Sequence, residues 1–437
     1  MIRGAGQARG SAFRALRHRD YRWYFLSGLG TSGAQGIQQF AIAWLVLDLT
    51  DSLGKLGIVI FMQGVPMSIT SVFGGLIVDR YNRRNVLILS QLVQTVCLGA
   101  LAVLTVAGVV EIWQVYVISV FLGITMAITI PARNALIRSL VEPEDVLNAV
   151  ALNSTQFQAG RIIFPSFGGG MIALVGVDST LVVAAACSLI GVLLLMVVRA
   201  AAPEAGRVHA SAAHELAEGF RYVLTTPYIR MVLSMSLSVA MFGLAFMALA
   251  PGFAREVMDF NATEAGLFVT ASGIGAVVGS AVLVMLDVRD QTRLFVFSTV
   301  SFSLSVFAIA VNPTFAGAFL FMAAFGFANS TLSIAGQTIF QMVVPQRLLG
   351  RVVSLWSLTA GLAFIAALPI GLLGDLVGLR WVLGSGALFL SVATFVRGFS
   401  ALTGRTSFQT EEDEPDRVTR VGALVAAEPE RQAPKVS

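Results

Sequence analysis

The sequence predicts an all-α membrane protein with twelve transmembrane helices arranged in two six-helix halves. Three observations predict this fold class: an apolar composition, a series of apolar windows long enough to cross a bilayer, and basic residues concentrated on one side. Of the 437 residues, 56% are apolar and 12% are charged, which is about half the charged fraction of an ordinary soluble domain. The chain also has 42 Gly and 30 Phe, and both residue types suit helices that pack closely in lipid.

Each expected span is an apolar window of about 20 residues. The first six spans are 23–47, 56–78, 86–108, 112–131, 147–174 and 179–198. The second six are 229–250, 264–286, 293–311, 314–340, 351–374 and 380–399. The spans divide the chain into a cytoplasmic N-terminal segment (1–20), an N-terminal half (21–198), a cytoplasmic linker (199–228), a C-terminal half (229–400) and a polar, disordered cytoplasmic tail (401–437).

The N-terminal segment is basic and polar, without the apolar core of a cleavable signal peptide. Phe13, Leu16 and Tyr21 lie among arginines, which favours a short helix on the membrane surface. A flexible basic leader fits the same residues equally well.

The distribution of basic residues predicts the orientation of the spans. If both termini are cytoplasmic, only Lys55, Arg255 and Arg380 fall outside, and Arg161 falls within a span. This arrangement obeys the positive-inside rule. It predicts a multi-pass protein of the plasma membrane. In a cell with two membranes, this is the inner membrane.

The two halves show a weak internal repeat. At one constant offset, identical residues align between the fifth and eleventh spans and the segments before them. The aligned pairs are Val141 with Val343, Pro143 with Pro345, Gly169 with Gly371, Val175 with Val377, and Gly176 with Gly378. Two parallel six-helix repeats are typical of secondary transporters, whose substrates cross between the halves.

A carboxylate at the C-terminal end of the second span needs a partner, because a helix C-terminus carries partial negative charge. Asp79 occupies this position within "GGLIVDRYNRR", Gly74 to Arg84. This stretch resembles the signature G-x-L-a-D-R-x-G-R-R between spans two and three of the major facilitator superfamily. Asn82 replaces the usual Gly, and we expect it to adopt the same left-handed turn.

The resemblance implies a latch at the cytoplasmic side, in which Asp79 faces the start of the eleventh span while the transporter is closed there. The residues assigned to this latch are Gly75, Asp79, Arg80, Arg83, Arg84 and Arg351. For the arginines, a simple role as basic flanks of the spans remains an alternative.

The fifth span contains "AGRIIFPSFGGG", Ala159 to Gly170. It resembles the antiporter motif G-x-x-x-G-P-x-x-G-G of exporting members of the superfamily. The matching residues are Gly160, Pro165, Gly168 and Gly169, and Phe164 replaces the central Gly. The small residues allow close helix packing and the proline permits a bend, so packing alone also explains them.

A longer stretch narrows the resemblance. Residues 130–165, together with "AWLVLDLTDS" and "ELAEGFRYVLTTPYIR", are similar to the drug:proton antiporter branch that includes enterobactin exporters and macrolide efflux pumps. In the superfamily, the first, fourth, seventh and tenth spans line the cavity. The candidate substrate-binding residues are Gln35, Gln39, Arg161, Phe242, Phe246, Asn329 and Gln337.

Arg161 is the intramembrane charge in this prediction, and such a residue is costly unless it faces protein, water or a ligand. It is expected either to contact an anionic substrate or to have a structural or gating role. The predicted spans hold no carboxylate near their middle, so the coupling site stays open. Asp375 near the outer end of the eleventh span is either a titrating group or a solvated helix end.

These features predict a transporter and not an enzyme, because the sequence has no phosphate-binding loop and no paired nucleophile and histidine. No cofactor, metal or nucleic acid is expected, and the partners are a small-molecule substrate and the lipid bilayer, with the chain a monomer. The favoured function is proton-coupled export of small amphiphilic molecules by alternating access. A lipid or lysophospholipid transporter and a non-transporting sensor or scaffold remain alternatives.

Overall fold

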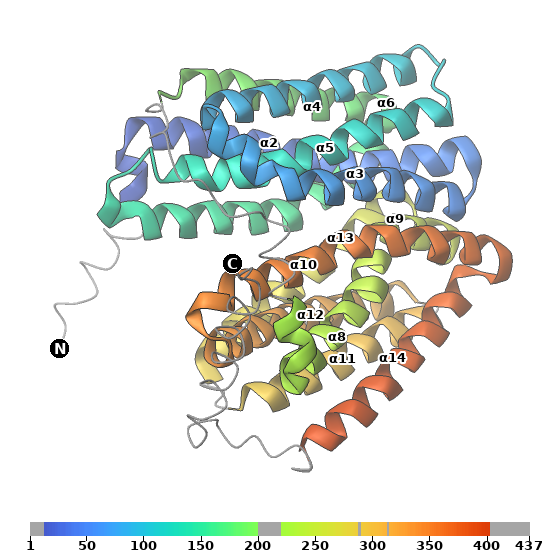
Figure 1. Ribbon diagram of the computed structural model, residues 1–437. Helices are drawn as coiled ribbons and strands as arrows, with labels where there is room; N and C mark the ends of the chain where they lie inside the picture. The colour runs from blue at the N-terminus through green and yellow to red at the C-terminus, as the bar shows by residue number, and fades with distance from the viewer. Residues whose placement is uncertain (1–12, 200–219, 287–289, 313, 403–437) are drawn as a thin grey trace, which may run out of the picture. The chain divides into compact units, whose positions relative to one another are not determined.

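The computed structural model describes residues 13–199, 220–286, 290–312 and 314–402, apart from the side chains of some helical residues. Residues Met1–Thr394 form one compact unit and Phe395–Ser437 a second. The described residues are helical and contain no β-strand (Figure 1). The all-α prediction is therefore confirmed, whereas the predicted tail and most of the linker lie outside the described residues.

The elements follow the predicted spans closely (Figure 1). The N-terminal half contains η1 (Arg14–Arg17), α2 (Arg19–Thr50), α3 (Leu53–Arg80), α4 (Arg83–Val106), α5 (Ile112–Ile137), η2 (Pro143–Asp145) and α6 (Val146–Val197). The C-terminal half contains α8 (Pro227–Val239), the π-helical turn η3 (Ala240–Leu244), α9 (Ala245–Glu256), α10 (Ala262–Leu286), α11 (Gln291–Val311), α12 (Phe315–Val343), α13 (Gln346–Val377) and α14 (Leu379–Leu402).

Helix α6 contains both the fifth and the sixth predicted spans. They meet at Gly176, whose φ of 83° is not helical. An L-residue with a side chain is disfavoured at this φ, so glycine suits the junction. Gly378, its partner in the internal repeat, ends α13 with a similar φ of 89°. The repeated glycines therefore have the same role in the two halves, which is to end one long helix and begin the next.

Nine helices in the described part of the chain are long and apolar enough to cross a membrane. This number treats α6 as one span, although it bends at Gly176, and it joins α8, η3 and α9 into another. Helix α2, with 32 residues, is about 48 Å long and exceeds the hydrocarbon thickness of a bilayer. It is not among the nine helices, because it is too polar. The number of twelve crossings stays a prediction.

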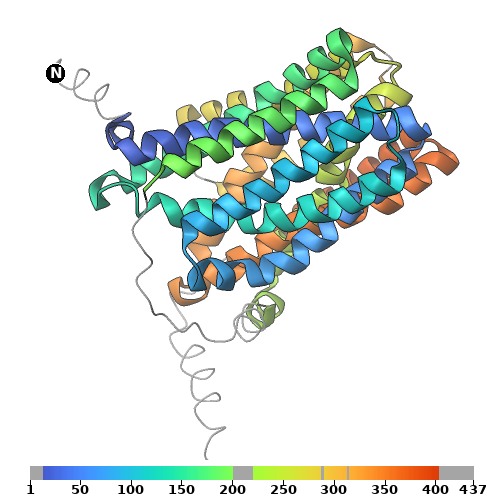
Figure 2. The same ribbon diagram turned by 90° about the horizontal axis from the view of Figure 1, so that it is seen from above.

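Within the compact unit, the helices of each half pack mainly on one another, and a few pairs join the halves. In the N-terminal half α2 and α4 pack on α6, and α3 packs on α5. In the C-terminal half α12 packs on α10 and α11. The two halves meet chiefly through α3 with α13 and α6 with α10; Figure 2 shows these helices from a second direction.

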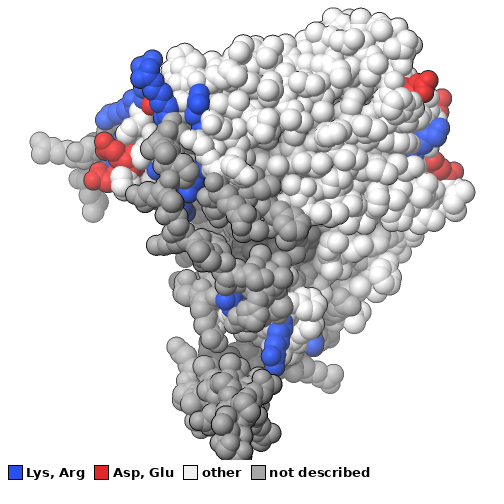
Figure 3. Space-filling model, turned by 45° about the horizontal axis from the view of Figure 1, so that its top comes forward, with Lys and Arg blue, Asp and Glu red and all other residues white. Residues whose placement is uncertain are grey.

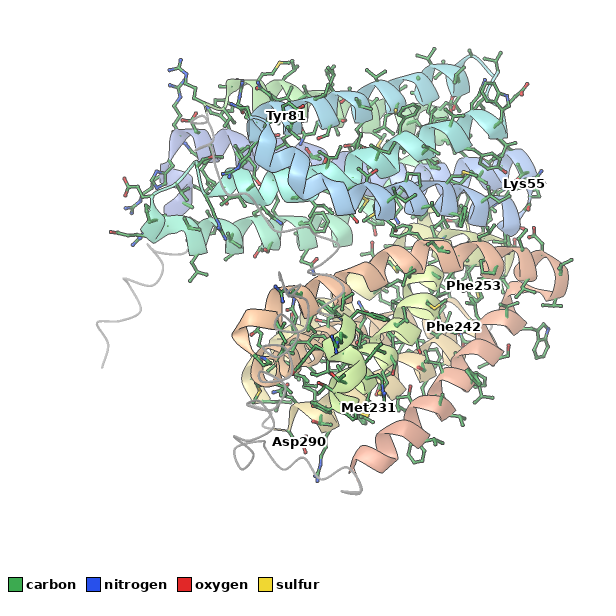
Figure 4. The ribbon with its side chains drawn as sticks, viewed as in Figure 1. Lys55, Tyr81, Met231, Phe242, Phe253 and Asp290 are labelled. Carbon is green, nitrogen blue, oxygen red and sulfur yellow. The ribbon has the colours of Figure 1, made fainter. Side chains whose placement is uncertain are left out.

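Charged residues gather where the helices begin and end. Figure 3 shows blue and red atoms at two opposite edges of the visible face, with uncharged atoms between them. Figure 4 shows Lys55 and Tyr81 at the two ends of α3. We call the end of the bundle with Lys55 and Asp375 the Asp375 end, and the end with Tyr81 and Arg84 the Arg84 end. An uncharged band between two charged ends is what a membrane-spanning protein requires.

The described part of the N-terminal segment contains the short 3-10 helix η1, and residues 1–12 lie outside the described residues. Residues 14–18 are not a flexible leader, because they bind the connection between α5 and α6, whereas contact with a membrane surface stays a prediction. Arg14 Nε and His18 Nε2 both bond the carboxylate of Asp145, the latter at 2.9 Å. The N–H of Ala15 donates to Asn148 Oδ1 at 3.0 Å. These hydrogen bonds from His18 and Arg14 hold the pKa of Asp145 below its ordinary value of 3.8.

Candidate functional site

The turn between α3 and α4 contains the superfamily signature, and Asn82 in it does not adopt the left-handed conformation that the sequence predicted. Its φ is −60° and its ψ is 113°. Its side-chain oxygen instead accepts hydrogen bonds from the N–H groups of Arg84, at 3.1 Å, and Asn85, at 3.4 Å. The prediction of a glycine-like turn was wrong because asparagine is also a strong N-cap residue, and Asn82 caps α4 here.

The two arginines after Asn82 bind the C-terminal ends of helices in their own half. Arg83 Nη1 donates to the carbonyl of Ala135 in α5 at 3.5 Å. Arg84 Nη2 donates to the carbonyl of Met196 in α6 at 2.5 Å. Both bonds satisfy carbonyls near helix C-termini, where a cation is favourable. The side chains of Gly75, Asp79 and Arg80 lie outside the described residues, so their place in the latch, like that of Arg351, stays a prediction.

At the opposite end of α3, the carboxylate of Asp375 caps the helix from α13. It accepts a hydrogen bond from Ser52 Oγ at 2.6 Å. It also accepts the N–H groups of Leu53 at 2.9 Å and Gly54 at 3.0 Å. A carboxylate suits this position because the first N–H groups of a helix lack partners within the helix and carry partial positive charge. Asp375 is therefore neither unpaired nor merely solvated, and it joins the two halves.

A second contact joins the halves at the Asp375 end. Arg255 of α9 forms an ion pair with Asp48 of α2, and its Nη2 lies 3.8 Å from Asp51 Oδ1. The guanidinium carbon also lies 5.1 Å from the centre of the Trp44 ring, within the range of a cation–π contact. Together with Asp375, these residues hold the Asp375 end of the two halves in contact.

The antiporter motif lies where α6 meets α10. A Cβ placed on Gly169 would lie 2.3 Å from the carbonyl oxygen of Ala262 and 2.9 Å from Cα of Gly266. Beside it, the hydroxyl of Ser166 bonds that of Thr270 and donates to the carbonyl of Gly266 at 3.3 Å. The small residues of the motif therefore allow backbone contact between the halves.

Phe164, which replaces a glycine of the motif, packs on two glycines of α2. A Cβ on Gly36 would lie 2.5 Å from Cβ of Phe164, and one on Gly33 would lie 3.2 Å from its ring. Of the other motif residues, Gly160 faces Ser32 and Gly168 faces the backbone of Ile37. The larger side chain is thus accommodated by small residues on the neighbouring helix, and α2 and α6 remain closely packed.

The glutamines of α2 separate into different environments. Gln38 is 5% exposed, and its side-chain oxygen accepts a hydrogen bond from Gln94 of α4 at 3.2 Å. Gln35 is half-buried and Gln39 is exposed. The structure leaves Gln35 and Gln39 accessible to a solute, and turns Gln38 into a contact between helices.

The candidates of the C-terminal half also differ in accessibility. Phe246 is fully buried, and its ring lies 5.8 Å from that of Phe253 and 5.7 Å from that of Phe325. It is a core residue in this conformation and cannot touch a substrate. Phe242, labelled with Phe253 in Figure 4, lies in the π-helical turn η3 and is half-buried, as is Asn329. Gln337 is exposed.

Sequence reasoning missed a basic residue within a helix. The predicted fourth span ended at Pro131, but α5 continues through this proline to Ile137 and includes Arg133. The guanidinium carbon of Arg133 lies 4.9 Å from the centre of the Tyr24 ring. Ala132, Leu136 and Ile137 recur at helical spacing after the proline, and this is the signal that could have extended the span. Arg161, the predicted intramembrane charge, has a side chain outside the described residues.

Arg133 and Gln156 form a polar cluster over Gly28 of α2. A Cβ on Gly28 would lie 2.3 Å from Arg133 Nη2 and 2.4 Å from Gln156 Nε2. In the part of the chain that the structure describes, Arg133 Nη1 and both amide atoms of Gln156 are buried without a hydrogen-bond partner. Such atoms are costly to leave unpaired, so this cluster is suited to bind water or a hydrogen-bonding group of a solute.

With this geometry in place, a comparison with protein families decides the class. The family described as transmembrane secretion effector, a branch of the major facilitator superfamily, matches residues 10–423. The chain belongs to this family. The resemblance proposed from the signature residues is therefore confirmed, and members of the family are transporters and not enzymes.

Individual relatives in this family are similar over nearly their whole length. The chain is 27% identical to the enterobactin exporter EntS of Salmonella choleraesuis over 386 residues, which cover 87% of this chain and 89% of the relative. It is 26% identical to EntS of Citrobacter koseri over 392 residues, with the same coverage.

Solved structures show the same fold at lower sequence identity. The nucleoside transporter NupG matches with a TM-score of 0.68 and 14% identity, over 90% of this chain and 100% of that one. A bacterial homologue of the human lysosomal transporter Spinster, in an inward-facing and unoccupied conformation, matches with a TM-score of 0.65 and 15% identity, over 92% and 99%. The major facilitator fold is therefore shown, and this family member is a multi-pass membrane transporter.

Proposed function

We propose that the protein is a secondary active transporter that exports small amphiphilic molecules of drug-, macrolide- or siderophore-like chemistry by alternating access. The observation that carries this proposal is the similarity to enterobactin exporters over 87% of the chain. The antiporter motif at the contact of α6 with α10 supports the direction of transport, because exporting members of the superfamily share it.

The Asp375 end faces the outside of the cell, and the Arg84 end with both chain termini faces the cytoplasm of the plasma membrane. The positive-inside rule supports this orientation. The structure then corresponds to a state that is closed on the outside, where Asp375 caps α3 and Arg255 pairs with Asp48. Export requires these contacts to break so that a solute can leave.

The solute passes the polar cluster of Arg133 and Gln156. A guanidinium with a buried Nη1 and a neighbouring amide offer several donors to acidic or hydroxylated groups. Arg133 and Gln156 lie over Gly28 of α2. Gln35 and Gln39 add amide groups farther along α2. Amphiphilic solutes need such isolated polar groups within an apolar path.

Protons drive the transport. The described carboxylates lie near the helix ends, as Asp48 and Asp375 do, and these two make contacts between the halves. The chain acts as a monomer on a small-molecule substrate within the bilayer and uses no cofactor.

Accumulation in cells tests this proposal. Cells that express the wild-type protein should retain less of a siderophore or a macrolide than cells that express Gly169→Leu at equal level, and a protonophore should abolish the difference. Equal retention of every compound by the two cell types would refute export. A change in the sidedness of labelled lipids instead would identify the protein as a lipid transporter.

Arg133 is tested in the same assay. Arg133→Gln should weaken export of an acidic substrate about tenfold, the loss of one charge-assisted contact. Arg138→Gln, at the exposed end of the same helix, is the matched control and should export normally.

A further inference from the structure

A basic pocket lies at the Arg84 end, on the N-terminal half. It has a volume of about 540 Å³ and is formed by the start of α2, the start of α4 and the end of α6. The residues that line it are Arg19, Asn82, Arg84, Met196, Val197, Val198 and Arg199. None of them belongs to the polar cluster of Arg133 or to the contacts that hold the Asp375 end closed.

The pocket has a strongly positive lining. Three of its seven lining residues are arginines and none is acidic. Among the described residues no ion pair neutralises these three guanidiniums. Arg84 Nε is buried without a hydrogen-bond partner, although Nη2 of the same group binds Met196. The carboxylate of Asp20 contacts the backbone of the lining, where it accepts the N–H of Arg199 at 3.0 Å.

The helix ends add to this field. Arg19 and Arg84 lie in the first turns of α2 and α4, where the helix dipole is positive. The negative C-terminal end of α6 is satisfied by the bond from Arg84 to the Met196 carbonyl. The pocket therefore combines a dense set of donors with a favourable potential for a phosphate group.

One wall of the pocket is apolar and continues along α6. Met196 and Val197 line the pocket and are both exposed. Leu193 and Leu189 follow at helical spacing on the same face and are also exposed. A molecule with a charged head and an apolar tail fits this sequence of surfaces, whereas a free anion uses only the first part.

We propose that this pocket binds the phosphate of an anionic phospholipid, whose acyl chain follows the exposed stripe of α6. Basic pockets between transmembrane helices on the cytoplasmic side are suited to anionic headgroups. The bound lipid holds the starts of α2 and α4 against the end of α6, and so stabilises the N-terminal half. The site does not depend on the transported substrate.

The test uses the full chain purified in neutral detergent. Thermal unfolding is followed during titration with phosphatidylglycerol, with phosphatidylcholine, or with inorganic phosphate. The test variant is Arg19→Gln with Arg199→Gln, which leaves the bond from Arg84 to α6 intact. The control variant, Arg17→Gln with Arg138→Gln, removes two exposed charges from the same end of the bundle.

Phosphatidylglycerol should stabilise the wild-type protein at lower concentration than phosphatidylcholine does, and inorganic phosphate should have little effect. The test variant should need about 30-fold more phosphatidylglycerol, which corresponds to about 1 kcal/mol for each arginine. The control variant should respond like the wild type.

Three results would overturn the proposal. An unchanged response of the test variant would remove the pocket as the site. An equal loss in the control variant would show general attraction of charge. Full stabilisation by inorganic phosphate would replace the lipid with a free anion.

Discussion

The carboxylate of Asp375 is the contact between the halves whose contribution can be worked out most directly. It caps α3 by accepting two backbone N–H groups and one hydroxyl across the boundary of the halves. Replacement with Ala removes a helix cap, about 1 kcal/mol, and a favourable charge at the helix N-terminus, about 0.5 kcal/mol. Replacement with Asn keeps an acceptor and loses only the second contribution.

These energies predict a graded change in conformation. If opening of the Asp375 end breaks the cap, the ratio of open to closed molecules should rise about tenfold in Asp375→Ala and about twofold in Asp375→Asn. The series Asp, Asn, Ala separates the effect of charge from that of hydrogen bonding.

Labelling of a buried cysteine measures this ratio. Leu56 in α3 is 1% exposed and packs near Gly252 of α9, so Leu56→Cys reacts with a water-soluble maleimide only after the halves separate. The native Cys97 and Cys187 are first replaced with Ser. The labelling rate of the purified protein should then follow the predicted series, since it reports the open fraction when opening is fast.

Glu111→Ala is the matched control, because Glu111 caps α5 within a single half. It should leave the labelling rate unchanged. Equal rates for Asp, Asn and Ala at residue 375 would show that the cap does not hold the halves together, and the reasoning would fail.

Three further outcomes are expected. Gly169→Ala should lower transport strongly at normal expression, because the new Cβ would lie 2.3 Å from the Ala262 carbonyl and backbone has little room to move; transport by the variant at the wild-type rate would contradict this. The pKa of Asp145 is lowered in the folded protein, so its contribution to stability is present above its unfolded value of about 4 and is lost as the pH falls below it. A spin label at residue 13 should therefore be immobile at pH 6 and mobile well below pH 4, and mobile at both in Asp145→Asn; a label that is immobile throughout would refute the role of this carboxylate. Asp79→Asn should favour opening at the Arg84 end, the opposite of Asp375→Asn, and the double variant should return toward the wild-type ratio; an additive shift in one direction would exclude opposed latches.

The fold was predictable because it rests on length, apolar windows and the distribution of charge. Helix ends were less predictable, because prolines do not interrupt all helices in a packed bundle. Pro131 lies within α5 and Pro165 within α6. Because the predicted fourth span ended at Pro131, it did not include Arg133.

The sequence predicted the contacts of the site only for residues that belong to a recognisable motif. Contact of Gly169 with α10 follows from the small residues of the motif. The bond from Asp375 to the start of α3 does not, because it joins residues that are far apart in the sequence. Asn82 shows a different limit, since one residue type suits both a left-handed turn and an N-cap, and only the surrounding chain selects between them.

We propose that helices α3 and α13 link the carboxylates of Asp375 and Asp79 in one mechanism. Asp375 lies near the C-terminal end of α13 and caps the N-terminus of α3, so the two helices are antiparallel. Asp79 lies near the C-terminal end of α3, and the superfamily signature implies that it faces the N-terminus of α13. Each helix thus ends in a carboxylate that is unfavourable beside its own C-terminus and favourable beside its neighbour's N-terminus. If the halves rock about their contact, forming one cap separates the partners of the other. Under this proposal, Asp375 caps α3 in one conformation and Asp79 caps α13 in the other. Because the two caps cannot form at the same time, they are a sufficient switch for alternating access.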